Sequence, residues 1–408
     1  MSSLTKGNAI IGQSGGPTAV INQSLVGVIE SVAKSKGQAI EKLWGARNGV
    51  RGIIEERFFD LNNVDAGLLE RIAQTPAAAL GSSRDKPDAE YCNKIFNVFK
   101  KNNVRYFFYI GGNDSADAAR IVNDLAKQAN YELHTFHVPK TIDNDLKVTD
   151  HCPGYGSAAR FVASAIMGDD RDNASLPGIK IDIIMGRHAG WLTAASVLAK
   201  SDETDGPHLI YVPEVRVSMD KFIDDVASVY SKYGRCLVAA SEGIEDIDGK
   251  AWGEKIVEGA ERDSHGNVQL SGSGALGDYL AEIVKTKVAA KLGGKKLRVR
   301  ADTFGYLQRS FAGYASPVDQ REARECGRKA VEYALAGAID GSVAMKRTGC
   351  CPASYGVEFF RAELKDVARE TKPLPKEFVN AQGNGITQAF IDYLRPLVGE
   401  LPTIGKFA

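Results

Sequence analysis

The chain has 408 residues, more than one compact core usually holds, so we expect two domains. Apolar residues make up 44% and charged residues 25%, the composition of an ordinary globular protein. Lys plus Arg and Asp plus Glu both number 51, so no overall basic field exists to attract nucleic acid. No stretch approaches the ~18 apolar residues of a membrane span, which excludes an integral membrane helix.

The amino-terminal residues lack a charged region followed by a long apolar stretch, so no signal peptide is expected. The six cysteines show no CxxC spacing, and the adjacent Cys350 and Cys351 make a poor metal-binding pair. We therefore expect reduced thiols and a cytoplasmic location.

Short apolar runs that end at glycine or a polar loop, each followed by a helical pattern, recur along the chain. The predicted strands cover residues 8–12, 104–110, 133–138, 181–184, 208–212, 236–240 and 297–301. The predicted helices cover about 17–32, 115–126 and 387–394, the last stopped by Pro396. This repetition predicts an α/β fold with doubly wound, mainly parallel sheets, whose ligands bind beyond the carboxyl ends of the strands. The polar, glycine-rich segment 246–277 is a mobile loop or hairpin, or an insertion without a role.

The first predicted strand leads into a glycine loop, Gly12-Gln-Ser-Gly15-Gly16-Pro17. Pro17 suits the first position of a helix, and backbone N–H groups of a glycine loop at a helix start can cradle phosphate. The pattern is neither a P-loop nor a dinucleotide fingerprint. A phosphate cradle and a plain strand-to-helix turn both remain open.

The second glycine loop is Gly111-Gly112-Asn113-Asp114-Ser115, again between a buried strand and a helix. Asp114 puts a formal charge where phosphate would approach, which is repulsive unless Mg²⁺ or a lysine lies between them. Asn113 can contact a cation only through a neutral oxygen. Asp114 as a simple helix cap is the alternative, and Ser115 is a further candidate cap.

The segment Pro139-Lys-Thr-Ile-Asp-Asn-Asp145 follows the strand that ends at Val138. Its two carboxylates, Asp143 and Asp145, can hold a metal or take a proton, and Lys140 can neutralise an anion. Phosphoryl transfer needs this combination, because its catalysis is mostly positioning and charge neutralisation. An ordinary polar turn would use similar residues.

Three arginines lie near apparent strand or loop ends: Arg84, Arg187 and Arg309. An arginine fork binds phosphate through two hydrogen bonds at once, although each of these residues taken singly could equally form a surface ion pair.

Taken together, these motifs resemble the phosphofructokinase family over most of the chain. The matching landmarks, in chain order, are Gly15-Gly16, LGSxR at 80–84, Gly111 to Ser115, TIDND at 141–145, MGR at 185–187, SEG at 241–243 and GYxQR at 305–309. Seven ordered matches are far more specific than any single motif.

The resemblance implies two lobes with the active site in the cleft between them. Residues 1–150 plus about 305–365 are expected to form the lobe that binds the phosphoryl donor. Residues from about 151 to 304 plus the carboxyl-terminal segment are expected to bind fructose 6-phosphate. Some contacts to the 6-phosphate cross a subunit boundary in the family, which implies a homodimer or a larger assembly.

Two positions separate the donor types of this family. ATP-using members usually have glycine at both, whereas pyrophosphate-using members have the aspartate and lysine that stand here as Asp114 and Lys140. A carboxylate fills the room that a nucleotide's α-phosphate would need and repels it, and the lysine offsets the charge of the shorter donor. The resemblance thus implies reversible phosphoryl transfer from pyrophosphate to fructose 6-phosphate.

The resemblance also implies roles residue by residue. Asp143 is the expected general base, with Lys140 and Asp114 as the other catalytic residues and Gly16 and Arg84 as diphosphate ligands. The expected ligands of the sugar phosphate are Thr141, Asp143, Met185, Gly186, Arg187, Glu242, Arg300, Tyr306 and Arg309. Mg²⁺ is the expected cofactor, near Asp114, Asp145 and Asn113; most members have aspartate at this last position, and asparagine would coordinate more weakly.

Three other functions compete with this interpretation. An ATP-dependent phosphofructokinase would have to tolerate Asp114. A catalytically silent regulatory subunit would usually lose residues of the 141–145 motif, and this chain keeps all five. An NAD-dependent dehydrogenase would need a GxGxxG loop, which the first glycine loop does not supply.

Overall fold

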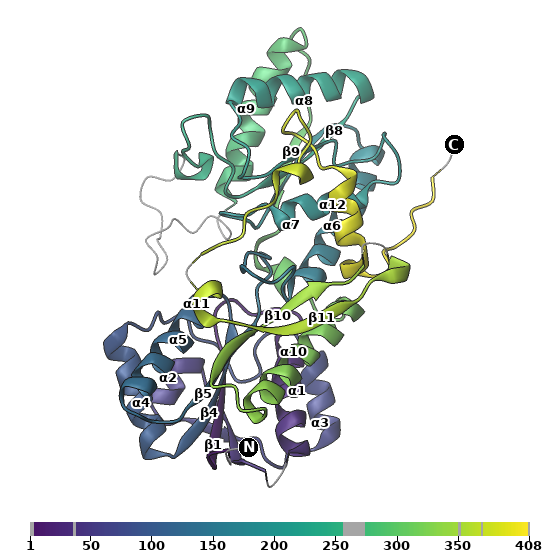
Figure 1. Ribbon diagram of the computed structural model, residues 1–408. Coiled ribbons are helices and arrows are strands. Elements are labelled where there is room, and N and C mark those ends of the chain that lie inside the picture. The colour runs from purple at the N-terminus through teal and green to yellow at the C-terminus, as the bar shows by residue number, and fades with distance from the viewer. Residues whose placement is uncertain (1–3, 36–37, 256–273, 350–351, 369, 407–408) are drawn as a thin grey trace. The chain divides into compact units, whose positions relative to one another are not determined.

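The computed structural model describes residues 4–35, 38–255, 274–349, 352–368 and 370–406. The chain divides into two compact units, and Figure 1 labels many of their elements. Unit 1 comprises Met1–Ser157 with Arg309–Lys372, and unit 2 comprises Ala158–Gln308 with Pro373–Ala408. Neither unit is one continuous segment, so the chain passes between them more than once.

Unit 1 is a seven-stranded sheet in the order β11-β10-β5-β4-β1-β2-β3. Its strands are β1 (Gly7–Gln13), β2 (Ile40–Ala46), β3 (Phe58–Asp60), β4 (Val104–Gly111), β5 (His134–Pro139), β10 (Asp340–Arg347) and β11 (Val357–Ala362). The inner strands pair in parallel, and the two edge strands β3 and β11 pair antiparallel. The prediction of mainly parallel sheets is confirmed.

Helices cover both faces of this sheet, which explains the continuous apolar runs of its central strands. Its helices are α1 (Ile21–Lys34), α2 (Gly49–Ile54), α3 (Ala66–Gln74), α4 (Ala89–Lys101), α5 (Asn113–Gln128), α10 (Pro317–Leu335) and α11 (Leu364–Val367), with the short 3-10 turn η4 (Pro352–Ser354). In Figure 1, α1, α3 and α10 lie on one side and α2, α4 and α5 on the other. The buried residues of the two sides form separate apolar clusters.

Unit 2 is a four-stranded parallel sheet in the order β7-β8-β6-β9. Its strands are β6 (Ile179–Ile184), β7 (Leu209–Tyr211), β8 (Cys236–Ser241) and β9 (Val299–Thr303). Its helices are most of α6 (Tyr155–Ser175), then α7 (Trp191–Ala194), α8 (Met219–Tyr233), α9 (Ala275–Lys291) and α12 (Gln388–Val398), with 3-10 turns η1 (Ala195–Ala199), η2 (Trp252–Lys255), η3 (Gly305–Arg309) and η5 (Lys376–Phe378). Alternate residues of β6 pack with α8 and α9 in one apolar cluster.

Two sequence predictions about helix limits are wrong. The helix after the first glycine loop begins at Ile21 and not at Pro17, because Gly15 and Thr18 first pair with a distant segment: Gly15 N donates to Ser83 O (2.9 Å) and Ala77 N to Thr18 O (3.1 Å). Helix α12 runs through Pro396 to Val398. Proline removes one N–H donor, and this loss falls in the last turn, where the helix is ending anyway.

Of the predicted loop 246–277, residues 256–273 lie outside the described residues, as do Cys350 and Cys351. The last residues of that loop, from Ala275, already belong to α9. Among the described residues, Cys92, Cys152, Cys236 and Cys326 are buried free thiols.

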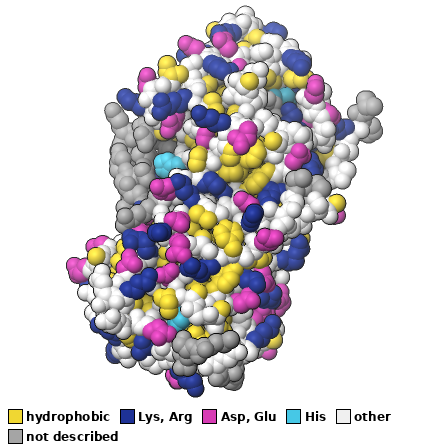
Figure 2. Space-filling view, in the orientation of Figure 1, with side chains coloured by type: hydrophobic (Ala, Val, Ile, Leu, Met, Phe, Trp, Pro, Cys, Tyr) yellow, Lys and Arg dark blue, Asp and Glu magenta, His cyan; other side chains and the backbone are white. Residues whose placement is uncertain are grey.

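Basic and acidic side chains are interspersed on the face drawn in Figure 2, in keeping with the equal numbers of the two signs. Within the described part of the chain, no helix combines the length and apolar character that crossing a bilayer requires.

Candidate active site

The predicted donor-binding residues gather in unit 1 beyond the carboxyl ends of β1, β4 and β5. These strands are neighbours in the sheet and run in parallel, so the loops that follow them meet at one edge. Lys140 N donates to Gly111 O (2.9 Å), and Ser115 Oγ donates to Ser14 Oγ (2.8 Å). These two bonds join the three loops.

Lys140 is the centre of this group. Its side chain is 4% exposed, and its Nζ donates to Gly16 O at 2.8 Å. The pKa of the Lys140 ammonium is lowered to about 8, mainly by burial; the carboxylates Asp143 and Asp145 oppose the shift, and Arg309 and Arg84 add to it. Lys140 thus has two arginines and two carboxylates as electrostatic neighbours, a charge arrangement suited to a phosphate anion with a bound cation.

Arg309 falls in this group, although the resemblance implied a contact to the sugar 6-phosphate. Its Nη1 lies 3.0 Å from the point where a Cβ on Gly16 would stand. Arg84 is exposed and directly follows Ser83, whose carbonyl accepts from Gly15 N at 2.9 Å. The structure thus brings Arg84 and Arg309 to the same glycine turn.

Helix α5 begins directly after the second glycine loop, with Gly112 as its N-cap and no side-chain cap. Neither Asp114 nor Ser115 is the cap: Ser115 is turned to Ser14, and Asp114 is exposed in the first turn, 3.6 Å from the ammonium of Lys86. Asn113 Oδ1 accepts a hydrogen bond from Asp114 N (2.7 Å) at the start of the helix. This bond occupies one of the two lone pairs of the side-chain oxygen.

The loop that follows β5 carries the two central carboxylates. Asp143 N donates to Thr141 Oγ1 at 3.1 Å, and Thr141 N donates to Pro153 O at 3.1 Å. Burial raises the pKa of Asp145, against the lowering effects of the Thr141 hydroxyl and the ammonium groups of Lys372 and Lys140.

Lys372 is a neighbour of this loop that sequence reasoning missed. Its backbone N donates to Asp145 O (2.6 Å), and its Nζ donates to the carbonyls of Thr149 (2.9 Å) and Asp150 (3.0 Å). Burial lowers the pKa of the Lys372 ammonium. No local motif marks this lysine, because its partners lie more than two hundred residues earlier in the chain.

The predicted sugar-binding residues of unit 2 follow β6, β8 and β9. Met185 N donates to Gln308 Oε1 (3.3 Å), and Glu242 N donates to Ile184 O (2.9 Å), so the loops after these strands are hydrogen-bonded to one another. Glu242 is 6% exposed. Gly186 has φ +148°, and a Cβ there would lie 2.7 Å from Ala189 O and 2.8 Å from Ser241 Oγ, so the turn before Arg187 requires glycine.

Tyr306, 44% exposed, lies in η3 after β9, close in sequence to Gln308. Arg300 lies elsewhere: it pairs with Lys180 in the β6–β9 register, five residues before Met185. At about 3.3 Å per residue, the level of Arg300 in the sheet is roughly 16 Å from that of Met185 along the strands. Arg300 therefore does not join the other predicted sugar-binding residues of its own unit.

The expected metal ligands do not form a cage of three carboxylates. Within the described residues, the one group of three carboxylates with mutually close oxygens is Asp169, Asp182 and Asp302 in unit 2, where Lys180 already pairs with two of them. Mg²⁺ usually binds one or two protein carboxylates together with substrate phosphates, so the two predicted carboxylate ligands, Asp114 and Asp145, are a sufficient number.

Comparisons with known proteins find relatives that match nearly the whole chain. The family profile described as Phosphofructokinase matches residues 8–334. A protein from Rhodospirillum rubrum named pyrophosphate--fructose 6-phosphate 1-phosphotransferase is 53% identical over 396 residues, 97% of this chain and 95% of the relative. A protein of the same name from Xanthomonas campestris is 38% identical and covers 98% of this chain and 93% of its own. The crystal structure of a pyrophosphate-dependent phosphofructokinase from Nitrosospira multiformis matches with a TM-score of 0.84 at 34% identity, over 99% of this chain and 94% of that chain.

Proposed function

The chain belongs to the phosphofructokinase family, and on this premise we propose that it transfers a phosphoryl group from pyrophosphate to the 1-hydroxyl of D-fructose 6-phosphate. The products are fructose 1,6-bisphosphate and phosphate, a step of glycolysis and gluconeogenesis in the cytoplasm. Pyrophosphate and the product ester have similar phosphoryl potential, so the reaction runs in both directions. The observation that best supports pyrophosphate as the donor is the buried Lys140, whose ammonium group is hydrogen-bonded to the carbonyl of Gly16.

In this reaction the oxygen of the sugar 1-hydroxyl attacks a phosphorus atom of pyrophosphate, and the carboxylate of Asp143 accepts the proton of that hydroxyl. The bond between that phosphorus and the bridging oxygen breaks, and phosphate leaves with the bonding electron pair. Lys140, Arg84 and Arg309 stabilise the negative charge that shifts to the leaving phosphate. This role for Arg309 replaces the expected contact to the sugar 6-phosphate.

Asp114 selects the donor by its charge and its position. It is exposed in the first turn of α5, beside the glycine loop that meets Lys140. A longer nucleotide would bring an α-phosphate against this carboxylate, whereas pyrophosphate has no such group. Asp114 therefore disfavours ATP, and Lys140 favours the small anion.

Mg²⁺ fits the donor group, with Asp145 and Asp114 as the carboxylates that would hold it and Asn113 as a weaker, neutral contributor. When bound, the ion neutralises the phosphate oxygens of the donor. Asp143 remains the base in this scheme, and Lys372 keeps the neighbouring loop in place through its bonds to Thr149 and Asp150.

Met185, Gly186, Arg187 and Glu242 bind the sugar, together with Thr141, and Tyr306 contacts the 6-phosphate. Arg300 is too far along the sheet to serve the sugar site of its own subunit. We propose that it serves the site of a second copy in a homodimer, the arrangement that the family's intersubunit contacts imply.

A mixing experiment tests this dimer. D143N and R300A are each expected to be nearly inactive, and random exchange of their subunits restores about one quarter of the wild-type activity, because mixed dimers keep one complete site. Failure of the mixture to recover, with exchange demonstrated by mass spectrometry, would show that Arg300 does not act across subunits.

The central test is phosphorylation of fructose 6-phosphate with Mg²⁺, with pyrophosphate and ATP offered in parallel. Turnover with pyrophosphate and not with ATP is the expected result. Turnover with ATP alone would overturn the assigned roles of Asp114 and Lys140, and inactivity with both donors would favour a regulatory subunit. Omission of Mg²⁺ in the presence of a chelator is expected to abolish turnover.

A further inference from the structure

We propose that Asp319 is a positioning residue for the loop that carries Asp143, and that it holds the general base in its working place without touching substrate. The inference rests on the phosphoryl transfer proposed above. Asp319 lies at the start of α10, more than 170 residues after the 141–145 motif, and none of the sequence motifs contains it.

Asp319 is a buried carboxylate with three donors from one short segment. It is 4% exposed. Its Oδ1 accepts from Gly154 N (2.8 Å), and its Oδ2 accepts from Ser157 N (2.9 Å) and from Ser157 Oγ (2.6 Å). Ser316 N in turn donates to Ser157 Oγ at 3.0 Å, which leaves the hydroxyl proton directed at Asp319. Charge-assisted bonds of this kind are about twice as strong as neutral ones.

The anchored segment is paired directly with the catalytic loop. Gly154 forms a parallel bridge with Thr141, in which Thr141 N donates to Pro153 O at 3.1 Å. Thr141 Oγ1 then accepts from Asp143 N at 3.1 Å. A short series of contacts therefore links Asp319 to the base. The Asp319 carboxylate binds Gly154 N, Gly154 pairs with Thr141, and the Thr141 hydroxyl accepts from the backbone N–H of Asp143.

Helix α10 also contacts His151, at the start of the segment that Asp319 anchors. Glu322, one turn after Asp319, bonds through Oε2 to His151 Nε2 (2.6 Å) and through Oε1 to the Tyr355 hydroxyl (2.6 Å). Burial raises the pKa of Asp319 to about 6, although the hydrogen bonds from Ser157 and Gly154 oppose the rise; the carboxylate is therefore mostly charged at neutral pH and accepts all three bonds. The amino-terminal part of α10 is thus a rigid support for residues 151–157.

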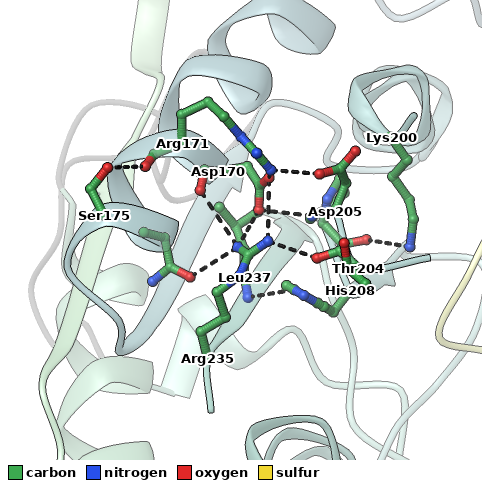
Figure 3. A network of polar contacts seen from close by, with 12 residues as sticks. Asp170, Arg171, Ser175, Lys200, Thr204, Asp205, His208, Arg235 and Leu237 are labelled. Atoms are coloured by element: carbon green, nitrogen blue, oxygen red, sulfur yellow. Dashed lines mark hydrogen bonds and ion pairs between the residues drawn. The ribbon is translucent and has the colours of Figure 1, made fainter. Parts of the chain in front are cut away.

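A matched control exists in unit 2. Asp205 is 3% exposed, its Oδ2 accepts from Ser201 N (3.0 Å) and Asp202 N (3.3 Å), and it pairs with Arg171. Figure 3 shows Asp205 facing Arg171 in a network that includes Asp170 and Arg235. It contacts none of the predicted site residues, so replacing it removes a similar buried carboxylate without touching the catalytic loop.

The experiment compares wild type, D319N and D205N in steady-state kinetics with pyrophosphate and fructose 6-phosphate. In D319N, the side-chain amide faces three donors, so the loop shifts; kcat falls by about 10- to 100-fold while both KM values stay within about threefold. D205N keeps kcat within about threefold. A D319N kcat near that of wild type, an equal loss in D205N, or a loss confined to KM would each overturn the proposal.

Two further measurements keep the test decisive. If D319N does not fold, Ser157→Ala removes one of the three bonds and is expected to lower kcat about 3- to 10-fold, and an unchanged kcat would contradict the proposal. Hydrogen exchange of residues 141–157 needs no activity: D319N should speed exchange at Thr141, Asp143 and Gly154, and D205N should not. If the wild-type protein shows no turnover, the proposed function fails, and the exchange result alone decides on Asp319.

Discussion

The side-chain ammonium of Lys140 donates a 2.8 Å hydrogen bond to the backbone carbonyl of Gly16 and lies 3.1 Å from where a Cβ on Gly15 would stand. A buried lysine thus contacts the backbone of the glycine turn directly. The helix that follows begins only at Ile21, so the positive end of its dipole starts five residues after Gly16. The positive charge next to the turn itself belongs to the side chains of Lys140 and Arg309.

Replacing Lys140 by Met is expected to lower kcat/KM for pyrophosphate by about 10²- to 10³-fold, because an oriented cation at the phosphate is lost; this corresponds to about 3–4 kcal/mol. The measurement is steady-state kinetics at saturating fructose 6-phosphate. Lys94→Met, at an exposed lysine paired with Glu90 on α4, is the control and should stay within about twofold. Equal effects of the two changes would contradict the assigned role.

The low pKa of Lys140, about 8, predicts a pH dependence. The ammonium is charged below that pH and loses its proton above it, so kcat/KM for pyrophosphate should fall as pH rises through about 8. The alkaline limb should be missing in Lys140→Met. An alkaline limb of the same midpoint in that variant would assign the titration to another group.

Stability should show the opposite trend at the same residue. The folded state binds fewer protons at Lys140 than the unfolded state between pH 8 and the ordinary value of 10.5, so this group makes the free energy of unfolding rise with pH in that window. Urea unfolding at pH 7.5 and 9.5 should show a smaller gain for Lys140→Met than for wild type. Equal increases in the free energy of unfolding for the two proteins would show that burial does not destabilise the charged form of Lys140.

Asp114 can be tested for charge and volume separately. Asp114→Gly should admit ATP as a donor and lower kcat/KM for pyrophosphate, since both the charge and the bulk are removed. Asp114→Asn keeps the bulk and removes only the charge. If charge dominates, the two variants gain similar ATP activity, and if volume dominates, only the glycine variant gains it. Continued refusal of ATP by Asp114→Gly would show that another residue selects the donor.

The crossing of α1 and α10 predicts a stability effect away from the site. A Cβ on Gly27 would lie 2.0 Å from Arg324 O, so Gly27→Ala must push the two helices apart and should cost about 1–3 kcal/mol in the free energy of unfolding. Gly168→Ala, within α6, meets no atom within 4 Å and should be neutral or stabilising by roughly 0.5–1 kcal/mol. Urea unfolding measures both, and a Gly27→Ala protein as stable as wild type would contradict the close packing.

The local signals predicted the parallel sheets and most strand positions well. The runs at 104–110, 133–138, 181–184 and 236–240 correspond closely to β4, β5, β6 and β8, because strands buried on both faces need continuous apolar residues. The start of α1 was missed for a physical reason. The residues after Gly16 satisfy their backbone groups with residues 77–83, and a partner so distant leaves no trace in the local pattern.

By itself, the sequence determined the fold class, the family and the residue types of the site, because hydrophobic periodicity and short motifs are local properties of the chain. Only the tertiary structure decided which distant groups meet: Lys140 with the Gly16 carbonyl, Arg309 with the same turn, Lys372 with the loop of Asp143 and Asp145, and Asp319 with residues 154–157 beside that loop. These contacts join residues far apart in the chain. They depend on strand order and helix packing, which bring distant loops to one sheet edge and set the burial that shifts their pKa values.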